Sequence, residues 1–338
     1  MNRFVSPLLA GGLLVFSMLC QVAAQQLPRV LNGPPGSVSF GTVVRALPNG
    51  NIVVTDPDWT GPGNLEKAGA VYLYDGTTLK IISTLTGAAA GDQVGLGGVT
   101  VVGGGHYVVA SPRWNEYRGA VTWCAGDTGV QGPVSGANSL TGTARGHAVG
   151  IGSVIVLRNG NYVVRSSWWN EGRGAVTWGS GTAGVRGGVS AANSLLGTIP
   201  NGQITVQILE NGHYLVQTQG AVTWGSGTAG VTGAVSEANS LVSADGLRID
   251  DPYGIYPIYS DGNYLVISSD YLTGRFGVTW GSGTAGVKGV ISTANTLTGF
   301  ALHPDIRMLS GGNYLVQAPE WNENRGAVTW GGAGVGVS

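Results

Sequence analysis

The chain has 338 residues, of which 60 are glycine, and only 10% are charged, against roughly a quarter in typical soluble proteins. Its 17 basic and 18 acidic residues give a formal net charge of −1, which provides no electrostatic basis for binding nucleic acid or an anionic membrane surface. The hydrophobic content of 43% is enough for a folded core, so the composition argues against a disordered chain.

The first 24 residues predict a secretory signal peptide. Arg3 provides the positive start, residues 4–20 are apolar, and Val22-Ala23-Ala24 offers small residues for cleavage. A membrane anchor and a lipoprotein modified at Cys20 are the alternatives, and the polar "QQLP" that follows favours cleavage over the anchor. We therefore expect an exported protein, secreted, at the cell surface or in the periplasm, with no transmembrane segment in the mature chain.

Cleavage would leave residues 25–338 as a single domain with 16 basic and 18 acidic residues, a net charge of −2. Cys124 is then the remaining cysteine, so an internal disulfide is impossible. The fold must rest on packing and on backbone hydrogen bonds.

Internal repeats dominate the rest of the chain. A turn followed by a strand recurs six times, as "NGNIVV" at 49, "GGHYVV" at 104, "NGNYVV" at 159, "NGHYLV" at 211, "DGNYLV" at 261 and "GGNYLV" at 311. A second segment follows each copy in step, as "GAVYLY" at 69, "GAVTW" at 119, 174, 220 and 326, and "FGVTW" at 276. The period is 50 to 55 residues, measured between the tyrosines at 107, 162, 214, 264 and 314.

One period, residues 152–197, predicts four strands. "GSVIVL" and "NYVVRS" flank Asn159-Gly160, a strong two-residue hairpin signal. "GAVTWG" gives the third strand, "SGTAG" a turn, and "VSAANSLLG" the fourth strand. We expect the repeated tyrosines and the GAVTW tryptophans to be buried: Tyr162, Tyr214, Tyr264, Tyr314, Trp123, Trp178, Trp224, Trp280 and Trp330.

A four-stranded antiparallel meander repeated six times predicts an all-β fold, a six-bladed β-propeller. In four repeats an asparagine follows the GAVTW tryptophan after 15 residues, but Trp330 has only eight residues after it. The segment Arg29–Gly33, "RVLNG", matches the fourth-strand segment "NSLLG". We therefore expect the N-terminal strand to pair with the C-terminal blade and close the ring, which would remove the exposed sheet edges. An open β-solenoid is the competing architecture.

The segment "WGSGTAG" occurs at 178, 224 and 280, and each copy fits the dinucleotide-binding pattern G-x-G-x-x-G. A dinucleotide loop must leave a strand and open a helix. Each copy here joins two predicted strands at the repeat spacing. The glycines are therefore predicted to be turn residues, and no cofactor is expected.

Two segments carry a family resemblance. "AGAVYLYDG" at 68–76 and "GDQVG" at 91–95 resemble the FG-GAP repeat of integrin α-subunit-type propellers. The form "NGNYVV…GAVTWGSGTAGV…ANSLLG" is similar to repeats of large bacterial haemagglutinin-like adhesins. The resemblance covers nearly the whole mature chain, and it implies an extracellular binding or adhesion role without catalysis.

The sequence departs from the FG-GAP pattern at the calcium loop. FG-GAP blades often carry D-x-[DN]-x-[DN]-G before the second strand, which supplies several oxygen ligands. Here the segment is shortened to "LRNGNY" or "YSDGNY", where Asp261 stands alone. We predict no calcium or other metal site.

The loops between the second and third strands carry the candidate binding residues. An aromatic residue recurs seven positions after the site of the NGNY tyrosine, at Trp59, Trp114, Trp169, Tyr271 and Trp321. Three of these loops add a Glu-x-Arg pair, namely Glu116/Arg118, Glu171/Arg173 and Glu323/Arg325. Such residues could stack on sugars or anchor a protein partner. The alternative, which their repetition in step with the fold favours, is that the aromatics plug the seams between blades and the pairs tie their own loops.

The fourth loop is the exception, because it shrinks to "QTQG" at 217–220 and opens a gap in the series. His106 and His213 replace the turn asparagine, so we expect both in a solvated turn. The four histidines lack metal-binding spacing, and no G-x-S-x-G motif is present. Asp92, Asp245 and Asp305 lie in predicted blade connections, and a central site formed by these carboxylates is the remaining route to an enzyme.

The sequence therefore predicts a protein that is not an enzyme. We expect an exported adhesion or protein-interaction module, and the alternative is a lectin-like module that uses the loop aromatics. The expected partner is a protein or a glycan on a cell surface or in a matrix.

Overall fold

The computed structural model describes residues 29–243, 247–249, 254–258, 262–270, 273–300 and 302–334. The chain divides into two compact units, Met1–Asn32 and Gly33–Ser338. The described part of the first unit, residues 29–32, forms neither helix nor strand. The described part of the second unit is built almost entirely of short strands, which confirms the predicted all-β class. In the described residues, no helix is long and apolar enough to cross a membrane.

In the described residues, each repeat contains three strands joined as hairpins, and the first five repeats add a fourth strand after them. Repeats two to five also contain a two-residue strand, and the fifth has one further short strand. The first repeat contains β1 (Val44–Ala46), β2 (Ile52–Asp56), β3 (Ala70–Tyr74) and β4 (Ile81–Thr86). The second contains β5 (Val99–Val101), β6 (Tyr107–Ser111), β7 (Ala120–Cys124), β8 (Gly132–Pro133) and β9 (Ser139–Thr141). The third contains β10 (Ser153–Val156), β11 (Tyr162–Ser166), β12 (Ala175–Gly179), β13 (Gly187–Gly188) and β14 (Ser194–Leu196).

The second half of the chain follows the same plan. The fourth repeat contains β15 (Ile204–Ile208), β16 (Tyr214–Thr218), β17 (Ala221–Gly225), β18 (Gly233–Ala234) and β19 (Leu241–Val242). The fifth contains β20 (Leu247–Arg248), β21 (Ile255–Pro257), β22 (Tyr264–Asp270), β23 (Phe276–Gly281), β24 (Gly289–Val290) and β25 (Thr296–Phe300). The sixth contains β26 (Asp305–Met308), β27 (Tyr314–Ala318) and β28 (Ala327–Gly331). Short turns add α1 (Trp114–Tyr117), α2 (Trp169–Gly172), α3 (Trp321–Asn324) and two 3₁₀ turns, Gly103–Gly105 and Ser310–Gly312.

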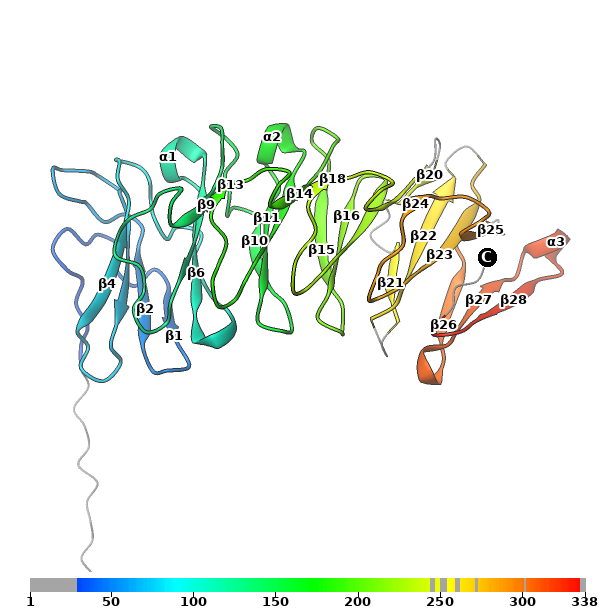
Figure 1. Ribbon diagram of the computed structural model, residues 1–338, viewed down its shortest axis with the longest axis horizontal. Coiled ribbons are helices and arrows are strands. Elements are labelled where there is room, and N and C mark those ends of the chain that lie inside the picture. Colours follow the sequence, from blue (N-terminus) through cyan, green and yellow to red (C-terminus); the bar gives the residue numbers. More distant parts are fainter. Residues whose placement is uncertain are drawn as a thin grey trace, which may run out of the picture. The chain divides into compact units, whose positions relative to one another are not determined.

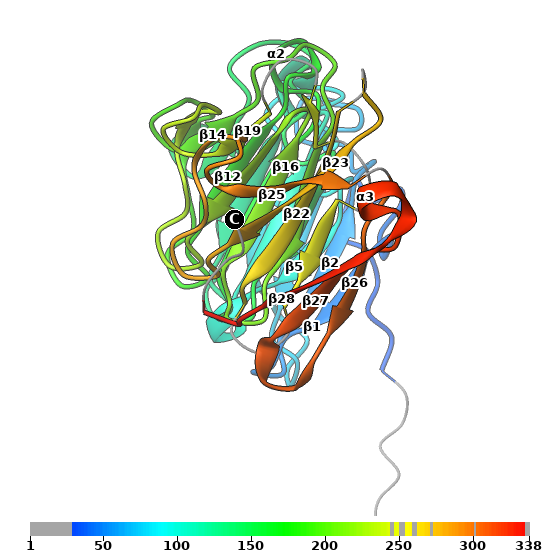
Figure 2. The same ribbon diagram turned by 90° about the vertical axis from the view of Figure 1, so that its right-hand side faces the viewer.

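The first four sheets are each completed by the repeat that follows. The two-residue strands β8, β13, β18 and β24 pair in parallel with β4, β9, β14 and β19, the fourth strands of the preceding repeats. Neighbouring sheets therefore lie side by side in chain order (Figure 1). In the view of Figure 2, the fourth strands β14 and β19 lie to one side and the first strands β1 and β5 to the other.

The predicted six-bladed propeller is therefore wrong. The first four sheets have five strands each and mix parallel with antiparallel pairs. The described strands of the fifth sheet number five and those of the sixth three, so no sheet is a four-stranded antiparallel blade. The residues that decide this are glycine-rich dipeptides such as Gly187–Gly188, which pairs with Leu140 and Thr141. Two glycines carry no alternation of apolar and polar side chains, so the sequence pattern did not indicate a strand there.

The predicted ring closure is also wrong. Among the described residues, no strand pair joins the sheet of β1–β4 to the sheet of β26–β28. The segment after residue 33 instead folds onto the first sheet, where Phe40 packs on Tyr72 with ring centroids 5.8 Å apart and Ser39 N–H donates to Asp56 Oδ1 at 2.9 Å. These contacts cover the first repeat without a strand from the last one.

From the second repeat on, the antiparallel strand that precedes the GAVTW strand begins with a buried tyrosine. Tyr162, Tyr214, Tyr264 and Tyr314 are completely buried, as the sequence predicted. The glycine after the GAVTW tryptophan makes room for this ring, because a Cβ on Gly179 would lie 2.3 Å from Cζ of Tyr162. The tryptophans themselves are only half-buried in the inner repeats, and Trp330 is 57% exposed, so their predicted full burial is wrong.

The tryptophans lie at the junctions between repeats. The indole N–H of Trp123, Trp178 and Trp224 donates to the carbonyl of Gly181, Gly227 and Gly283 in the next repeat, at 2.9, 3.0 and 2.8 Å. The last glycine of the same turn lies against the indole, since a Cβ on Gly184 would come within 2.5 Å of Cβ of Trp123. The G-x-G-x-x-G segment is thus a turn that contacts a tryptophan of the preceding repeat.

Polar side chains tie the same turns together. Asn161 Oδ1 accepts the N–H of Gly181 at 2.9 Å, and its Nδ2 donates to Gly227 O in the next repeat at 2.8 Å. In the fourth repeat His213 takes this place, and its Nδ1 accepts the N–H of Gly227 at 2.9 Å. Its ring packs on Trp224 with centroids 4.8 Å apart. The predicted solvated turn is therefore a half-buried contact, and burial lowers the pKa of His213.

Replacing Gly184 by alanine tests the junction. Gly184 has a φ of +73°, where a Cβ costs about 1–2 kcal/mol, and the Cβ would also collide with Trp123. Gly187 is the matched control, because its φ is +91° but nothing lies within 4 Å of its Cβ position. We expect Gly184→Ala to lower the free energy of unfolding by at least about 2 kcal/mol more than Gly187→Ala in urea titrations. Equal losses would show that the indole contact contributes nothing.

The His213 contact predicts a loss of stability in acid. Because the folded-state pKa lies below the unfolded value of about 6.5, the unfolded chain binds more protons between the two values. The contribution of neutral His213 to the free energy of unfolding is complete above pH ~6.5 and is lost as the pH falls through the folded-state pKa. His213→Asn introduces the residue found at the equivalent Asn161. It should reduce the dependence of the free energy of unfolding on pH, measured by urea titrations at a series of pH values. An unchanged slope would contradict the contact, and the exposed His303→Asn is the control.

Candidate functional site

Three loops carry the sequence W-N-E-x-R and form tight left-handed turns, labelled α1, α2 and α3; we call them the WNE loops. In α2, Asn170 has a φ of +47° and Glu171 a φ of +60°. Asparagine tolerates this left-handed conformation. For glutamate the same conformation costs about 1–2 kcal/mol. The turn is closed by hydrogen bonds from Gly174 N–H to Trp169 O at 3.1 Å and from Arg173 N–H to Asn170 O at 3.2 Å.

The structure places the predicted aromatics at successive repeats and not around one common site. Trp169 is 8% exposed and packs in the core between the second and third repeats, where its ring meets His147 at 5.6 Å. Trp114 packs against the core of the first two repeats. Trp59 donates its indole N–H to Pro35 O at 2.9 Å. Trp321 is 44% exposed, and Tyr271 lies outside the described residues.

The predicted Glu-x-Arg pairs differ from one loop to the next. Arg173 contacts Glu171 at 3.5 Å and also donates to Thr198 O in the following connection. Arg118 donates to the carbonyl of Thr143 at 2.6 Å. The described residues show no ion pair between Glu116 and Arg118 or between Glu323 and Arg325. Both bonded arginines thus tie a WNE loop to the connection that follows it.

The three candidate carboxylates do not form a described cluster. Asp92 is buried and accepts the N–H groups of Ala88 and Ala89, each at 2.9 Å, so it closes a turn. Asp305 lies in β26 and contacts Arg307 at 3.3 Å. Asp245 lies outside the described residues. In the described part of the chain, no group of three or more metal-binding side chains is present.

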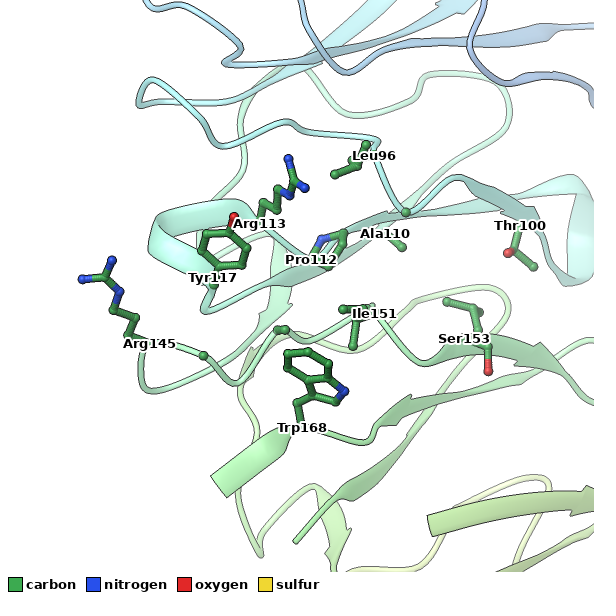
Figure 3. Close-up of a pocket in the computed structure, with 15 residues that line it drawn as sticks. Leu96, Thr100, Ala110, Pro112, Arg113, Tyr117, Arg145, Ile151, Ser153 and Trp168 are labelled. Atoms are coloured by element: carbon green, nitrogen blue, oxygen red, sulfur yellow. The ribbon is translucent and has the colours of Figure 1, made fainter. Parts of the chain in front are cut away.

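A cavity of about 570 Å³ lies between the second and third repeats (Figure 3). The α1 loop contributes Arg113 and Tyr117, the connection contributes Ile151, and the residue before α2 contributes Trp168. Trp168 is 61% exposed and Tyr117 is 50% exposed. The cavity therefore presents large aromatic surfaces to solvent although both loops are anchored in the core.

Two further cavities lie next to the first and share lining residues in series. A cavity of about 370 Å³ shares Trp168 with it, and a third of about 630 Å³ shares Asn201, Gln203 and Thr205 with the second. Together they cross the second, third and fourth repeats, and we call them the groove. The third cavity is lined almost entirely by amide and hydroxyl side chains, namely Asn201, Gln203, Thr205, Gln207, Gln217, Thr218 and Gln219.

The groove opens where the fourth repeat lacks a WNE loop. Its second and third strands, β16 and β17, are joined only by Gln219 and Gly220. Gln217 and Gln219 line the third cavity at this short turn. The sequence showed the shortened loop, but its consequence, an amide-lined cavity, needed the structure.

Trp168 was missed because its neighbour Trp169 fits the repeat pattern. The position before the repeated aromatic is Asp58, Arg113 or Glu320 in other repeats. A position that is charged elsewhere faces solvent in this fold. A tryptophan at such a position is therefore exposed, and this comparison of repeats is the signal that could have identified it.

The comparison with known families matches the repeats. The model of a family described as a repeat of unknown function (DUF5650) matches six times, at residues 46–96, 101–151, 156–206, 208–246, 258–305 and 308–338. The predicted six-fold repetition is confirmed, and the match identifies neither an FG-GAP nor a haemagglutinin-like family. No curated protein matches the chain.

The adjacent tryptophans predict opposite effects on stability. Trp169→Ala removes a core side chain and should lower the free energy of unfolding by about 3–5 kcal/mol. Trp168→Ala removes an exposed ring and should change it by no more than about 0.5 kcal/mol. Urea unfolding of both variants measures the difference. A large loss for Trp168→Ala would mean that this ring supports the fold and is not free to meet a ligand.

Proposed function

We propose that this chain, which belongs to the family of repeats of unknown function (DUF5650), is an exported binding module without catalytic activity. Its partner is an extended ligand on a cell surface or in an extracellular matrix. The apolar N-terminal segment with its small-residue cleavage site supports export. The groove across the second to fourth repeats supports the binding role.

The observation that carries the proposal is the shared lining of three cavities. Volumes of about 570, 370 and 630 Å³ are each in the range of small-ligand sites. Because Trp168 borders the first two cavities and Asn201 the last two, a ligand that fills one can continue into the next. This arrangement suits a chain-like ligand better than a compact metabolite.

The chemistry of the lining favours holding a ligand over transforming it. The groove residues offer aromatic faces, arginines, amides and hydroxyls. Among the described lining residues there is no histidine, carboxylate or thiol to act as a base or an activated nucleophile. Cys124 lies elsewhere and is completely buried, and burial raises the pKa of its thiol to about 12.

The groove is also held in place before a ligand arrives. The junction between the second and third repeats is fixed by Trp123, and the next junction is fixed by Trp178. A preformed surface loses less conformational entropy on binding than a flexible one. A lectin-like role is the second candidate, and the amide-rich third cavity favours it over a purely protein-binding role.

The exposed indole gives the test. We expect the exported chain to bind at least one ligand on arrays of glycans and matrix proteins. Trp168→Ala should weaken that binding at least about tenfold, or ~1.4 kcal/mol. Trp321→Ala is the matched control, because Trp321 is also exposed but belongs to α3, outside the groove. The proposal fails if no ligand binds, or if both variants bind as tightly as the unmodified chain.

A further inference from the structure

We infer that the groove binds a linear acidic glycan, whose sugar rings stack on Trp168 and whose carboxylate or sulfate groups meet the groove arginines. The inference rests on the proposed binding function and adds the class of ligand. It joins three observations, the charge of the lining, the exposed indole at its centre and the row of amides in its third cavity.

The lining is positively charged in a chain that is slightly acidic. Arg113 and Arg145 line the first cavity and Arg165 the second, and the described lining contains no carboxylate. The whole chain has a formal net charge of −1, and only 10% of its residues are charged. Three cations without a counter-charge on one groove therefore favour an anionic ligand.

The three arginines are held to different degrees. Arg165 donates to Gly152 O at 2.9 Å, and Arg113 donates to Gln93 and lies over the Tyr117 ring at 5.8 Å. Arg145 is exposed and has no ion pair within the described residues. Figure 3 shows it extending from its loop at the outer end of the cavity. A guanidinium group offers paired N–H donors that match a carboxylate or sulfate.

Trp168 provides the stacking surface. Its indole is 61% exposed and borders both the first and the second cavity. Figure 3 shows the ring beside Ile151, with Pro112 and Tyr117 on the opposite side of the cavity. The apolar face of a pyranose ring packs well on such a surface, while its hydroxyls stay in contact with water or polar side chains.

The third cavity provides partners for those hydroxyls. An amide side chain carries two N–H donors and one carbonyl acceptor side by side, so it can bind two neighbouring hydroxyls. Gln217 already donates to Ile249 O at 2.6 Å. Gln203, Gln207 and Gln219 make no side-chain hydrogen bond within the described part of the chain. Their amides are therefore available to a ligand.

An extended acidic peptide is the competing ligand. Peptides in extended grooves are selected by pockets for alternate side chains. Val206 is the one aliphatic residue among the described residues that line the third cavity. A continuous amide and hydroxyl surface fits a series of sugar hydroxyls better than alternating side chains.

The test compares matched ligands by titration calorimetry. The acidic probes are oligogalacturonate, hyaluronan oligomers and heparin fragments, and the comparison probes are methyl-esterified galacturonan, cello-oligosaccharides and polyglutamate. We expect at least one acidic glycan to bind at least about tenfold tighter than every neutral glycan. Binding should weaken as salt is raised, because exposed ion pairs are screened.

Variants separate charge from stacking. Arg145→Gln should weaken the acidic glycan about fivefold or more without changing any neutral glycan, and Arg325→Gln, an exposed arginine in the sixth repeat outside the groove, should change neither. Trp168→Ala should weaken binding about tenfold and Trp168→Phe much less. Tighter Trp168-dependent binding of a neutral glycan or of polyglutamate would overturn the acidic-glycan inference but leave the proposed function standing. Binding of no probe, together with none on the arrays, would overturn both.

Discussion

Three successive junctions, from the second repeat to the fifth, share one contact, a tryptophan that lies over a glycine turn of the next repeat. Trp123 donates its N–H to Gly181 O at 2.9 Å and packs against Gly184. Because the ring and the turn come from different repeats, neither is complete alone. The parallel strand β13 leaves the same turn and completes the sheet behind it. The stability of such a series is approximately the sum of the stability of each repeat and of each junction between neighbouring repeats. Weakening one junction therefore destabilises the repeats on both sides of it.

The sequence predicted the structure within one repeat, but it did not predict the strand pairs that join one repeat to the next. The period, the hairpin at Asn159-Gly160 and the buried Tyr162 follow from local patterns that short strands and tight turns require. The direction in which Gly187–Gly188 pairs is not a local property. A ring and an open series use the same alternation within each strand, so periodicity could not separate them.

The candidate site was predictable only in part, for a related reason. Residues that recur in step, such as Trp169 and Trp114, pack at the junctions that every repeat must form. The groove instead lies where repeats differ, at Trp168 and at the short turn of Gln219. Selecting the repeated aromatics therefore selected packing residues in these two loops. The cavities of this chain were therefore indicated by departures from the shared pattern and not by the pattern itself.

The groove crosses two junctions, which links binding to the stacking of the repeats. The spacing between Trp168 and the amides of the fourth repeat is fixed by the Trp178 contact with Gly227. A ligand that occupies both ends of the groove fits only while that junction is intact, so it stabilises the stacked form by mass action. The stacked form in turn presents all binding groups at once, as multivalent binding requires. Under the proposed function, tryptophans outside the groove therefore determine whether a chain-like ligand could be held along its length.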